Sequence, residues 1–173
     1  MKIFVCQICG EVYIGRETPH SCPFCGVRKE NLRMADGWED RNNVSLNEVD
    51  EKNVKDALAL EMSNTAFYQQ ASKKLSNQEA VLMFKGLFKV EREHASIYKK
   101  LLKLEETPML TEDCPDSARE CALESSKREK RAVEFYAQAA AVAENSRVKE
   151  VFTEIMKVES DHVALDEEMI KKF

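Results

Sequence analysis

The sequence predicts a small metal-bound β/knuckle domain followed by an all-α four-helix bundle. Two cysteine motifs near the N-terminus, CQICG at 6–10 and CPFCG at 22–26, indicate the first part. Beyond residue 54, apolar residues recur at helical spacing, which indicates the second part. An internal repeat of 68 residues further indicates that the helical part is a duplicated hairpin. A chain of 173 residues is long enough for one bundle-sized core and a small satellite.

Composition excludes several classes of function. The chain has 31 acidic and 26 basic residues and no basic block, so neither nucleic acid nor an anionic membrane is an expected partner. The N-terminus has no signal-peptide pattern and no stretch approaches a membrane span, so we expect a soluble, cytoplasmic protein. In that reducing compartment, six cysteines indicate metal binding rather than disulfides. With three histidines and five glycines, a Ser-His hydrolase or a Gly-rich phosphate loop is disfavoured.

Residues 1–38 contain a predicted four-thiolate metal site. Each Cys-x-x-Cys-Gly turn directs two sulfurs at one ion, and the glycine supplies the positive φ that the turn needs. Strand-like runs, KIFVC and EVYIG, surround the motifs. Tetrahedral sulfur sites hold either metal, so a structural zinc ribbon and a one-electron iron centre both remain open. The predicted ligands are Cys6, Cys9, Cys22 and Cys25, whereas Cys114 and Cys121 have no ligand spacing and stay unassigned.

The rest of the chain predicts a linker and four helices. Residues 39–53 are polar and charged, which is typical of a linker. Helical periodicity covers 54–75, 79–104, 117–143 and 147–171. The short loop at 76–78 makes the first two helices antiparallel, and the longer break before 117 can cross the bundle from end to end. The two predicted hairpins therefore span 54–105 and 117–173.

A shift of 68 residues superposes these two hairpins. It gives twelve identities in 52 ungapped pairs, where average composition would give about three. The shift aligns Glu61 with Glu129, the segment KVE at 89–91 with KVE at 157–159, and His94 with His162. It also aligns aromatic residues that we predict to be core: Phe67, Phe84, Phe135 and Phe152.

Each half offers one glutamate in its first helix and one Glu-x-x-His in its second. Three residues advance a helix by about 300°, so Glu91 and His94 share a face. One such pair alone is usually a solvated surface feature, but two copies in register, each with an upstream glutamate, indicate a dinuclear site. Four inward carboxylates would cost many kcal/mol unless divalent ions compensated their charge. The predicted ligands are Glu61, Glu91, His94, Glu129, Glu159 and His162.

Tyr68 and Tyr136 are further candidates for this site. Each lies seven residues beyond Glu61 or Glu129, on nearly the same helix face. A hydrogen bond from each hydroxyl to a metal-binding carboxylate would help to manage protons during catalysis. A buried tyrosine whose hydroxyl is satisfied elsewhere is the alternative, and both remain open here.

The paired cysteine motifs and the duplicated Glu/Glu-x-x-His pattern together resemble the rubrerythrins over nearly the whole chain. Because the cysteine motifs come first, the order resembles the reverse rubrerythrin arrangement. The resemblance implies a small rubredoxin-like β/knuckle metal domain followed by an all-α ferritin-like four-helix bundle. It implies one iron at the four cysteines and two irons in the bundle, although zinc suits the former site and manganese or mixed metals suit the latter.

The resemblance also implies a function and partners. It implies a non-haem iron peroxidase that reduces hydrogen peroxide to water, with dioxygen as a further substrate, in oxidative-stress defence. Electrons would come from an external donor such as a rubredoxin or an NAD(P)H-dependent rubredoxin reductase. The family also implies a homodimer, in which the rubredoxin-like domain of one subunit serves the di-iron site of the other.

One departure from the family concerns a seventh carboxylate ligand. Rubrerythrins carry an additional glutamate one turn from the third-helix ligand, but Ala132 stands one turn after Glu129. Glu124 and Glu134 are nearby, yet five residues turn a helix by about 500°, which directs them away from Glu129. We therefore expect no seventh ligand on this helix.

Two other functions fit the same motifs. The first is ferroxidase activity or iron storage by the bundle, with a structural zinc ribbon as a docking module. The second is a non-catalytic metal-binding scaffold. Storage would require a large hollow shell, whereas a peroxidase needs only a small oligomer.

Overall fold

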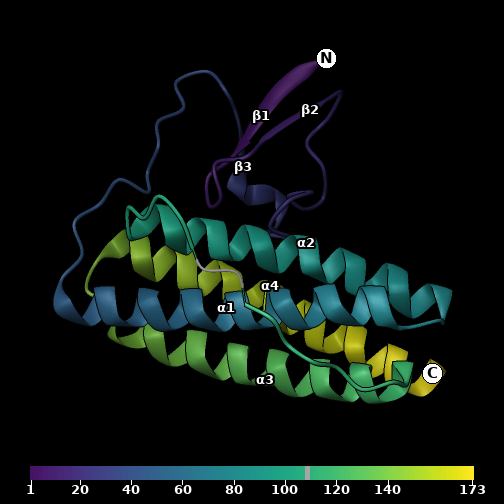
Figure 1. The fold of residues 1–173 in the computed structure, drawn as a ribbon. Coiled ribbons are helices and arrows are strands. Elements are labelled where there is room, and N and C mark those ends of the chain that lie inside the picture. Colours follow the sequence, from purple (N-terminus) through teal and green to yellow (C-terminus); the bar gives the residue numbers. More distant parts are fainter. Residues whose placement is uncertain (108–109) are drawn as a thin grey trace.

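The structure is a computed structural model that describes residues 1–107 and 110–173. A three-stranded sheet lies above one side of a four-helix bundle, nearest to α2 (Figure 1). The elements of the N-terminal module, which we define as residues 1–38, are β1 Lys2–Cys6, β2 Val12–Gly15, the 3-10 helix η1 Lys29–Asn31 and β3 Leu32–Met34. The helices of the bundle are α1 Glu48–Lys74, α2 Gln78–Leu101, α3 Ala118–Val142 and α4 Ser146–Lys172.

The sheet of the module is antiparallel, with the strand order β2-β1-β3. The first cysteine turn, at 6–10, connects β1 to β2, and the second, at 22–26, lies between β2 and β3. The amide of Gly10 donates to the carbonyl of Cys6 at 2.9 Å, and the amide of Gly26 donates to that of Cys22 at 3.0 Å. Both glycines have positive φ, at 83° and 78°, which residues with a side chain rarely adopt. Each turn therefore closes as the sequence predicted.

Each bundle helix begins at a capping side chain. Asn47, Asn77, Ser117 and Asn145 accept backbone N–H groups of the first turns of α1 to α4. The predicted helices agree with the observed ones within three residues, except at the first. The helix α1 starts at Glu48, inside the predicted linker 39–53, because Asn47 caps it and acidic residues in its first turn favour a helix N-terminus.

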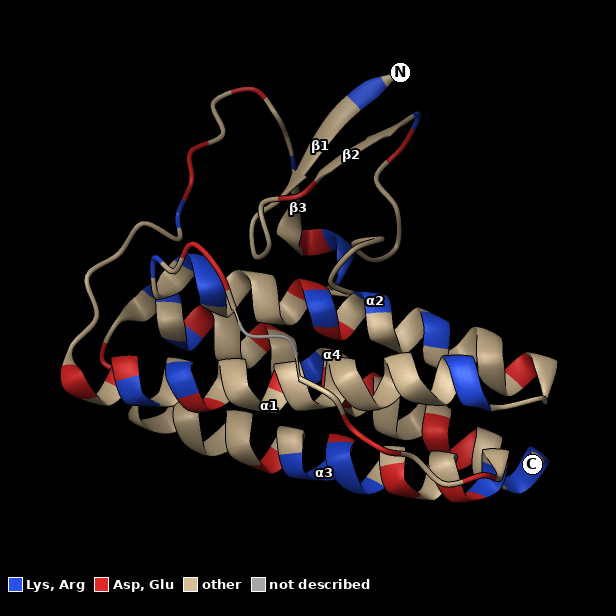
Figure 2. Ribbon diagram, in the orientation of Figure 1, with Lys and Arg blue, Asp and Glu red and all other residues tan. Residues whose placement is uncertain are grey.

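The two halves form antiparallel hairpins, α1 with α2 and α3 with α4 (Figure 1). Three of the predicted core phenylalanines are buried, and Phe135 is half-buried against the apolar cluster that contains Phe152. Charged residues of both signs lie along the outer faces of the helices (Figure 2). Within residues 1–107 and 110–173, no helix is both long and apolar enough to cross a membrane. The break predicted between the second and third helices includes residues 108–109, which lie outside the described residues.

The module packs directly on its own bundle. Buried Ile8, Val27 and Leu32 join one apolar cluster with residues of all four helices. The guanidinium of the buried Arg147 donates to the carbonyls of Gln7 and Ile8, at 2.6 and 3.0 Å. These contacts fix the cysteine turns against α2 and α4.

Gly26 offers a test of this docking. A Cβ atom added there would lie 2.8 Å from Val158 Cγ1 of α4, and the positive φ adds strain of about 1–2 kcal/mol for any side chain. We expect Gly26→Ala to destabilise the folded chain by at least that amount and to loosen the module, seen as faster amide hydrogen exchange at 20–28.

Gly86 of α2 is the matched control, because nothing lies within 4 Å of an added Cβ there. Gly86→Ala should stabilise the helix by about 0.5–1 kcal/mol. Equal effects of the two substitutions on thermal unfolding would show that the module does not depend on close packing at Gly26.

Candidate metal centres

The four cysteines of the module lie together and are buried. The Sγ atoms of Cys6 and Cys25 are 3.7 Å apart, and those of Cys9 and Cys22 are 3.8 Å apart. A tetrahedral ion with metal–sulfur bonds of about 2.3 Å has sulfur–sulfur edges of about 3.8 Å, so the spacing fits one ion. This geometry confirms the prediction of a four-thiolate site in the module.

Protonation of the four thiols is unequal. Hydrogen bonds among the sulfurs lower the pKa of Cys6 and Cys22, and they raise the pKa of Cys9 and Cys25. A bound metal takes four thiolates and so removes this competition for protons. The sulfur cluster is therefore better suited to a metal than to free thiols.

The six predicted carboxylate and imidazole residues converge in the centre of the bundle, and all of them are buried. They form two overlapping groups, within each of which the ligand atoms lie within 4.8 Å of one another. One group is Glu61, Glu91, His94 and Glu159, and the other is Glu91, Glu129, Glu159 and His162. Each group could hold one ion, and the two glutamates that belong to both groups, Glu91 and Glu159, could bridge the ions.

Both imidazoles turn Nδ1 toward the carboxylates. Nδ1 of His94 lies 3.0 Å from Glu159 and 3.7 Å from both Glu61 and Glu91. Nδ1 of His162 lies 2.9 Å from Glu159 and 3.1 Å from Glu91. The two rings stack with centroids 6.3 Å apart. The arrangement therefore gives each of two neighbouring ions one imidazole.

The donor set fits a pair of divalent irons. Five carboxylate oxygens of the cluster and Nδ1 of His94 are buried without a hydrogen-bond partner among the described residues. A buried polar atom left unpaired costs about 1–3 kcal/mol, and more when it is charged. Coordination of two cations satisfies these atoms and offsets the repulsion between the carboxylates. Carboxylate oxygen and imidazole nitrogen are ligands that iron accepts, and manganese accepts them as well.

Without metal, the cluster favours the protonated forms of two of its glutamates and of both histidines. Burial, together with the charges of Glu91 and Glu159, raises the pKa of Glu61 and of Glu129 well above the usual value. Burial alone would lower the pKa of His94, but the nearby Glu159 and Glu91 raise it to about 10. The pKa of His162 is also raised, by its carboxylate neighbours against the effect of burial.

The two predicted tyrosines contact the cluster across the bundle. The hydroxyl of Tyr68 on α1 donates to Glu129 on α3, and the hydroxyl of Tyr136 on α3 donates to Glu61 on α1. Each tyrosine thus reaches the glutamate of the other half, because α1 and α3 lie side by side. The helix spacing had indicated only that each tyrosine lies near the glutamate of the same helix. The pairing with the glutamate of the other hairpin is seen only in the structure.

Among the described residues, one hydrogen bond directly joins the two candidate metal centres. Nε2 of His94 lies 2.9 Å from the backbone carbonyl oxygen of Cys25. Because a carbonyl oxygen only accepts, Nε2 carries the proton and Nδ1 is left free to bind a metal. No sequence pattern indicates this contact, since it depends on how the module sits on α2.

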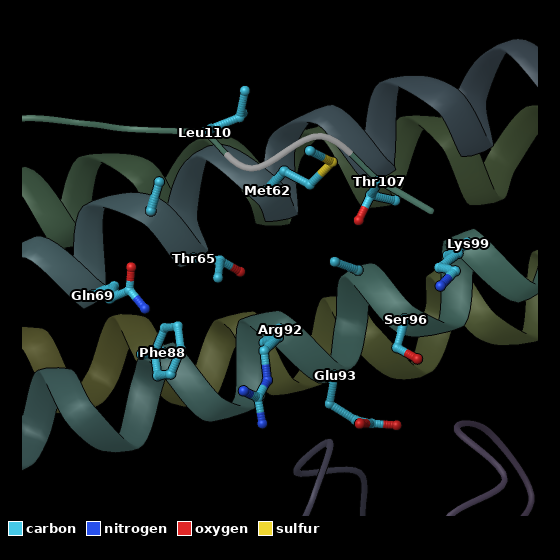
Figure 3. A pocket seen from close by; sticks show the side chains of 12 residues that line it. Met62, Thr65, Gln69, Phe88, Arg92, Glu93, Ser96, Lys99, Thr107 and Leu110 are labelled. Carbon is cyan, nitrogen blue, oxygen red and sulfur yellow. The ribbon is translucent and has the colours of Figure 1, made fainter. Parts of the chain in front are cut away.

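The other candidates from the sequence lie away from the cluster. Glu124 forms an ion pair with Arg128, and Glu134 is exposed, so neither supplies a seventh ligand. Cys114 and Cys121 are buried at one end of the bundle. The pocket between α1 and α2 in Figure 3 is lined by residues of the opposite helix faces, such as Phe88 and Arg92, and by none of the cluster residues.

Fold and site together define a bundle protein with a buried dinuclear carboxylate centre and an added four-cysteine metal module. The ferritin-like domain family matches residues 50–172, and the family of rubredoxin-like domains of rubrerythrin matches residues 4–33. The chain belongs to the ferritin-like family, with its two domains in the reverse rubrerythrin order.

One relative carries that order in its name. Reverse rubrerythrin-1 from Clostridium acetobutylicum is 27% identical over an alignment of 113 residues. The alignment covers 59% of this chain and 62% of the relative. No solved structure matches the chain. The resemblance seen in the sequence is therefore confirmed at the level of family and domain order.

Removal of a glutamate from only one of the two groups tests the ligand assignment. We expect Glu129→Ala to lose at least the ion of the group with His162, while the sulfur site keeps its metal and its colour. Metal analysis with visible absorption measures both sites in one sample. Glu134→Ala, an exposed position on the same helix, is the control, and unchanged bundle metal in Glu129→Ala would contradict the assignment.

The metal-free protein should lose stability as the pH rises from 7 to 10. His94 and His162 have raised pKa values in the folded chain, so they stay protonated there while the unfolded chain has already released these protons. The raised pKa values of Glu61 and Glu129 act in the same direction. Thermal unfolding should therefore show a falling midpoint without metal and a flatter one with it, and a rising midpoint in the metal-free chain would contradict this explanation.

Proposed function

We propose that the chain is a non-haem iron peroxidase that reduces hydrogen peroxide to water and takes its electrons through the four-cysteine site. The observation that carries this proposal is the hydrogen bond from His94 Nε2 to the carbonyl of Cys25. It joins a residue of the dinuclear cluster directly to a residue of the sulfur cluster. A storage protein with a structural zinc ribbon has no use for such a link, whereas an enzyme that is re-reduced after each turnover does.

The residues of the dinuclear cluster have different roles in the proposed reaction. When bound, two irons supply the electrons that cleave the O–O bond, and an iron at the cysteines supplies their replacements singly. Glu91 and Glu159 belong to both ligand groups and would hold both ions, and burial of the cluster excludes bulk water. His162 alone of the six retains some exposure, at 9%, so we expect peroxide to enter on its side of the cluster.

Tyr68 and Tyr136 hold protons at the cluster. Burial, with the charges of Glu129 and Glu61 respectively, raises the pKa of each hydroxyl well above its usual value. Both hydroxyls therefore stay protonated and donate to a carboxylate through the working pH range. Reduction of one peroxide to two waters consumes two protons, and these tyrosines stand where such protons must arrive.

The electron path that we propose runs within one chain. Lys100 Nζ donates to the carbonyl of Cys9 at 2.8 Å, and Arg147 holds the same turn from the other side. These bonds hold the first cysteine turn on the bundle, and Cys9 of that turn belongs to the same sulfur cluster as Cys25. The resemblance implied transfer between the subunits of a homodimer, but the contacts within a single chain support transfer inside it. An external donor, such as a rubredoxin or its NAD(P)H-dependent reductase, would feed the exposed module.

Loss of one sulfur ligand tests the electron path. We expect Cys9→Ser to abolish the colour of the sulfur site and to lower donor-supported peroxide reduction at least tenfold, while the bundle keeps its metal. Cys9 is preferred to Cys25 because the carbonyl of Cys25 contacts His94, so a substitution at Cys25 would also disturb the bundle site. Peroxide consumption with a reductase as donor gives the rate, and metal analysis gives the bundle content.

Cys114→Ala is the matched control, because this buried cysteine lies outside the sulfur cluster. It should retain both colour and turnover. Full donor-supported turnover in Cys9→Ser would contradict the proposed path. A shell-sized oligomer with a mineral core in light scattering would support iron storage instead.

A further inference from the structure

One buried acid of the bundle takes no part in the metal cluster. Asp166 on α4 is fully buried, one turn beyond His162, and is outside both groups of candidate ligands. Neither of its carboxylate oxygens has a hydrogen-bond partner among the described residues. An ionised carboxylate in such a place is costly, so the side chain is suited to hold a proton.

A chain of hydroxyls leads from this acid to the cluster. The hydroxyl of Ser125 on α3 lies close enough to Asp166 to lower the pKa of that carboxyl, and it donates to the Tyr68 hydroxyl at 3.1 Å. The Tyr68 hydroxyl in turn donates to Glu129. Both hydroxyls are buried, so the path is protected from bulk water.

The internal repeat shows that this path exists in one half of the bundle only. A shift of 68 residues places Ala57 at the position of Ser125, and Tyr98 at the position of Asp166. Tyr98 is buried and stacks on Tyr136, with centroids 6.0 Å apart. The two positions in the other half that correspond to Ser125 and Asp166 therefore carry neither a serine nor a carboxylate. Duplication preserved the cluster and the tyrosines, but the acid and the serine belong to the His162 side alone.

Charged or titratable groups face Asp166 from every helix of the bundle. His162 precedes it on α4, Glu91 faces it from α2, Lys130 from α3, and the Tyr68 hydroxyl from α1. Burial is the largest effect and raises the pKa of Asp166 to about 7, although Ser125, His162 and Lys130 lower it. The carboxyl can therefore both release and regain a proton near neutral pH.

We propose that Asp166 is a proton-relay residue that delivers protons to Glu129 through Ser125 and Tyr68, on the His162 side of the dinuclear cluster. The inference rests on the proposed peroxidase function, whose reaction consumes two protons. In each transfer, the Asp166 carboxyl must first rotate to form a hydrogen bond with Ser125, because none joins them in the structure. Asp166 then donates its proton to Ser125 Oγ, Ser125 donates its own to Tyr68 Oη, and Tyr68 donates to Glu129. Both hydroxyls end as they began, and the buried Asp166 regains a proton from water when local opening of the bundle exposes it.

Kinetics of two substitutions test the relay. Asp166→Asn keeps the shape of the side chain but cannot supply a proton, and Ser125→Ala interrupts the path. We expect each to lower kcat for peroxide about tenfold or more, to leave KM and iron content unchanged, and to flatten the pH profile near neutrality. Asp166→Glu should restore part of the rate. A rate and pH profile of Asp166→Asn equal to those of the unsubstituted protein would overturn the inference.

Tyr98→Phe is the matched control, since it removes a hydroxyl from the equivalent position of the other half. It should keep both rate and pH profile. A loss in Tyr98→Phe equal to that in Asp166→Asn would show that any polar change in these layers slows turnover, and would overturn the specific role of Asp166.

A second readout does not depend on activity. In pH-difference infrared spectra of the iron-loaded protein, we expect a buried carboxylic acid band that titrates near neutral pH, is retained in Tyr98→Phe and disappears in Asp166→Asn. A band that persists in Asp166→Asn overturns the inference. If the unsubstituted protein shows this band and yet reduces no peroxide, the proposed function fails while the proton-holding role of Asp166 stands.

Discussion

Four buried carboxylates at the centre of the bundle are the constraint on which the rest of the structure depends. Glu61, Glu91, Glu129 and Glu159 are all removed from water, and their mutual repulsion would oppose folding if nothing neutralised them. The two imidazoles, the two tyrosine hydroxyls and the bound protons each reduce that repulsion in part. Two divalent cations remove most of it, so metal binding and folding of this bundle are coupled.

The position of the N-terminal module follows from the same centre. Orientation of His94 requires an acceptor for its Nε2 proton, and the acceptor is the carbonyl of a cysteine in the other candidate metal site. This hydrogen bond orients the histidine and links the two centres, while the shared apolar cluster and Arg147 hold the module on the bundle. Gly26, which meets α4 where a side chain would not fit, allows this close approach.

The sequence predicted those features that depend on local spacing. The two cysteine turns and the two Glu-x-x-His pairs are each recognisable within a few residues of chain. In the structure the four cysteines lie together in one site, and the glutamates and histidines lie together in another. The sequence did not predict contacts that depend on how the elements pack. The reach of Tyr68 to Glu129 requires α1 beside α3, and the contact between His94 and Cys25 requires the docked module.

Two further differences have identifiable reasons. The start of α1 within the predicted linker depends on the capping side chain of Asn47, whose signal is one residue long. Asp166 is not among the identities of the repeat, because its equivalent in the first half is Tyr98. The same shift would have shown a carboxylate opposite Tyr98 at a core position, and such a mismatch within a preserved repeat is itself a functional signal.

Metal analysis of the purified protein together with its visible spectrum tests the central claim most directly. An electron-carrying sulfur site coupled to a dinuclear iron centre predicts about three irons per chain, and a visible colour that a reductant bleaches and peroxide restores. A colourless protein with zinc at the four cysteines would contradict the claim, because zinc cannot carry an electron to the bundle.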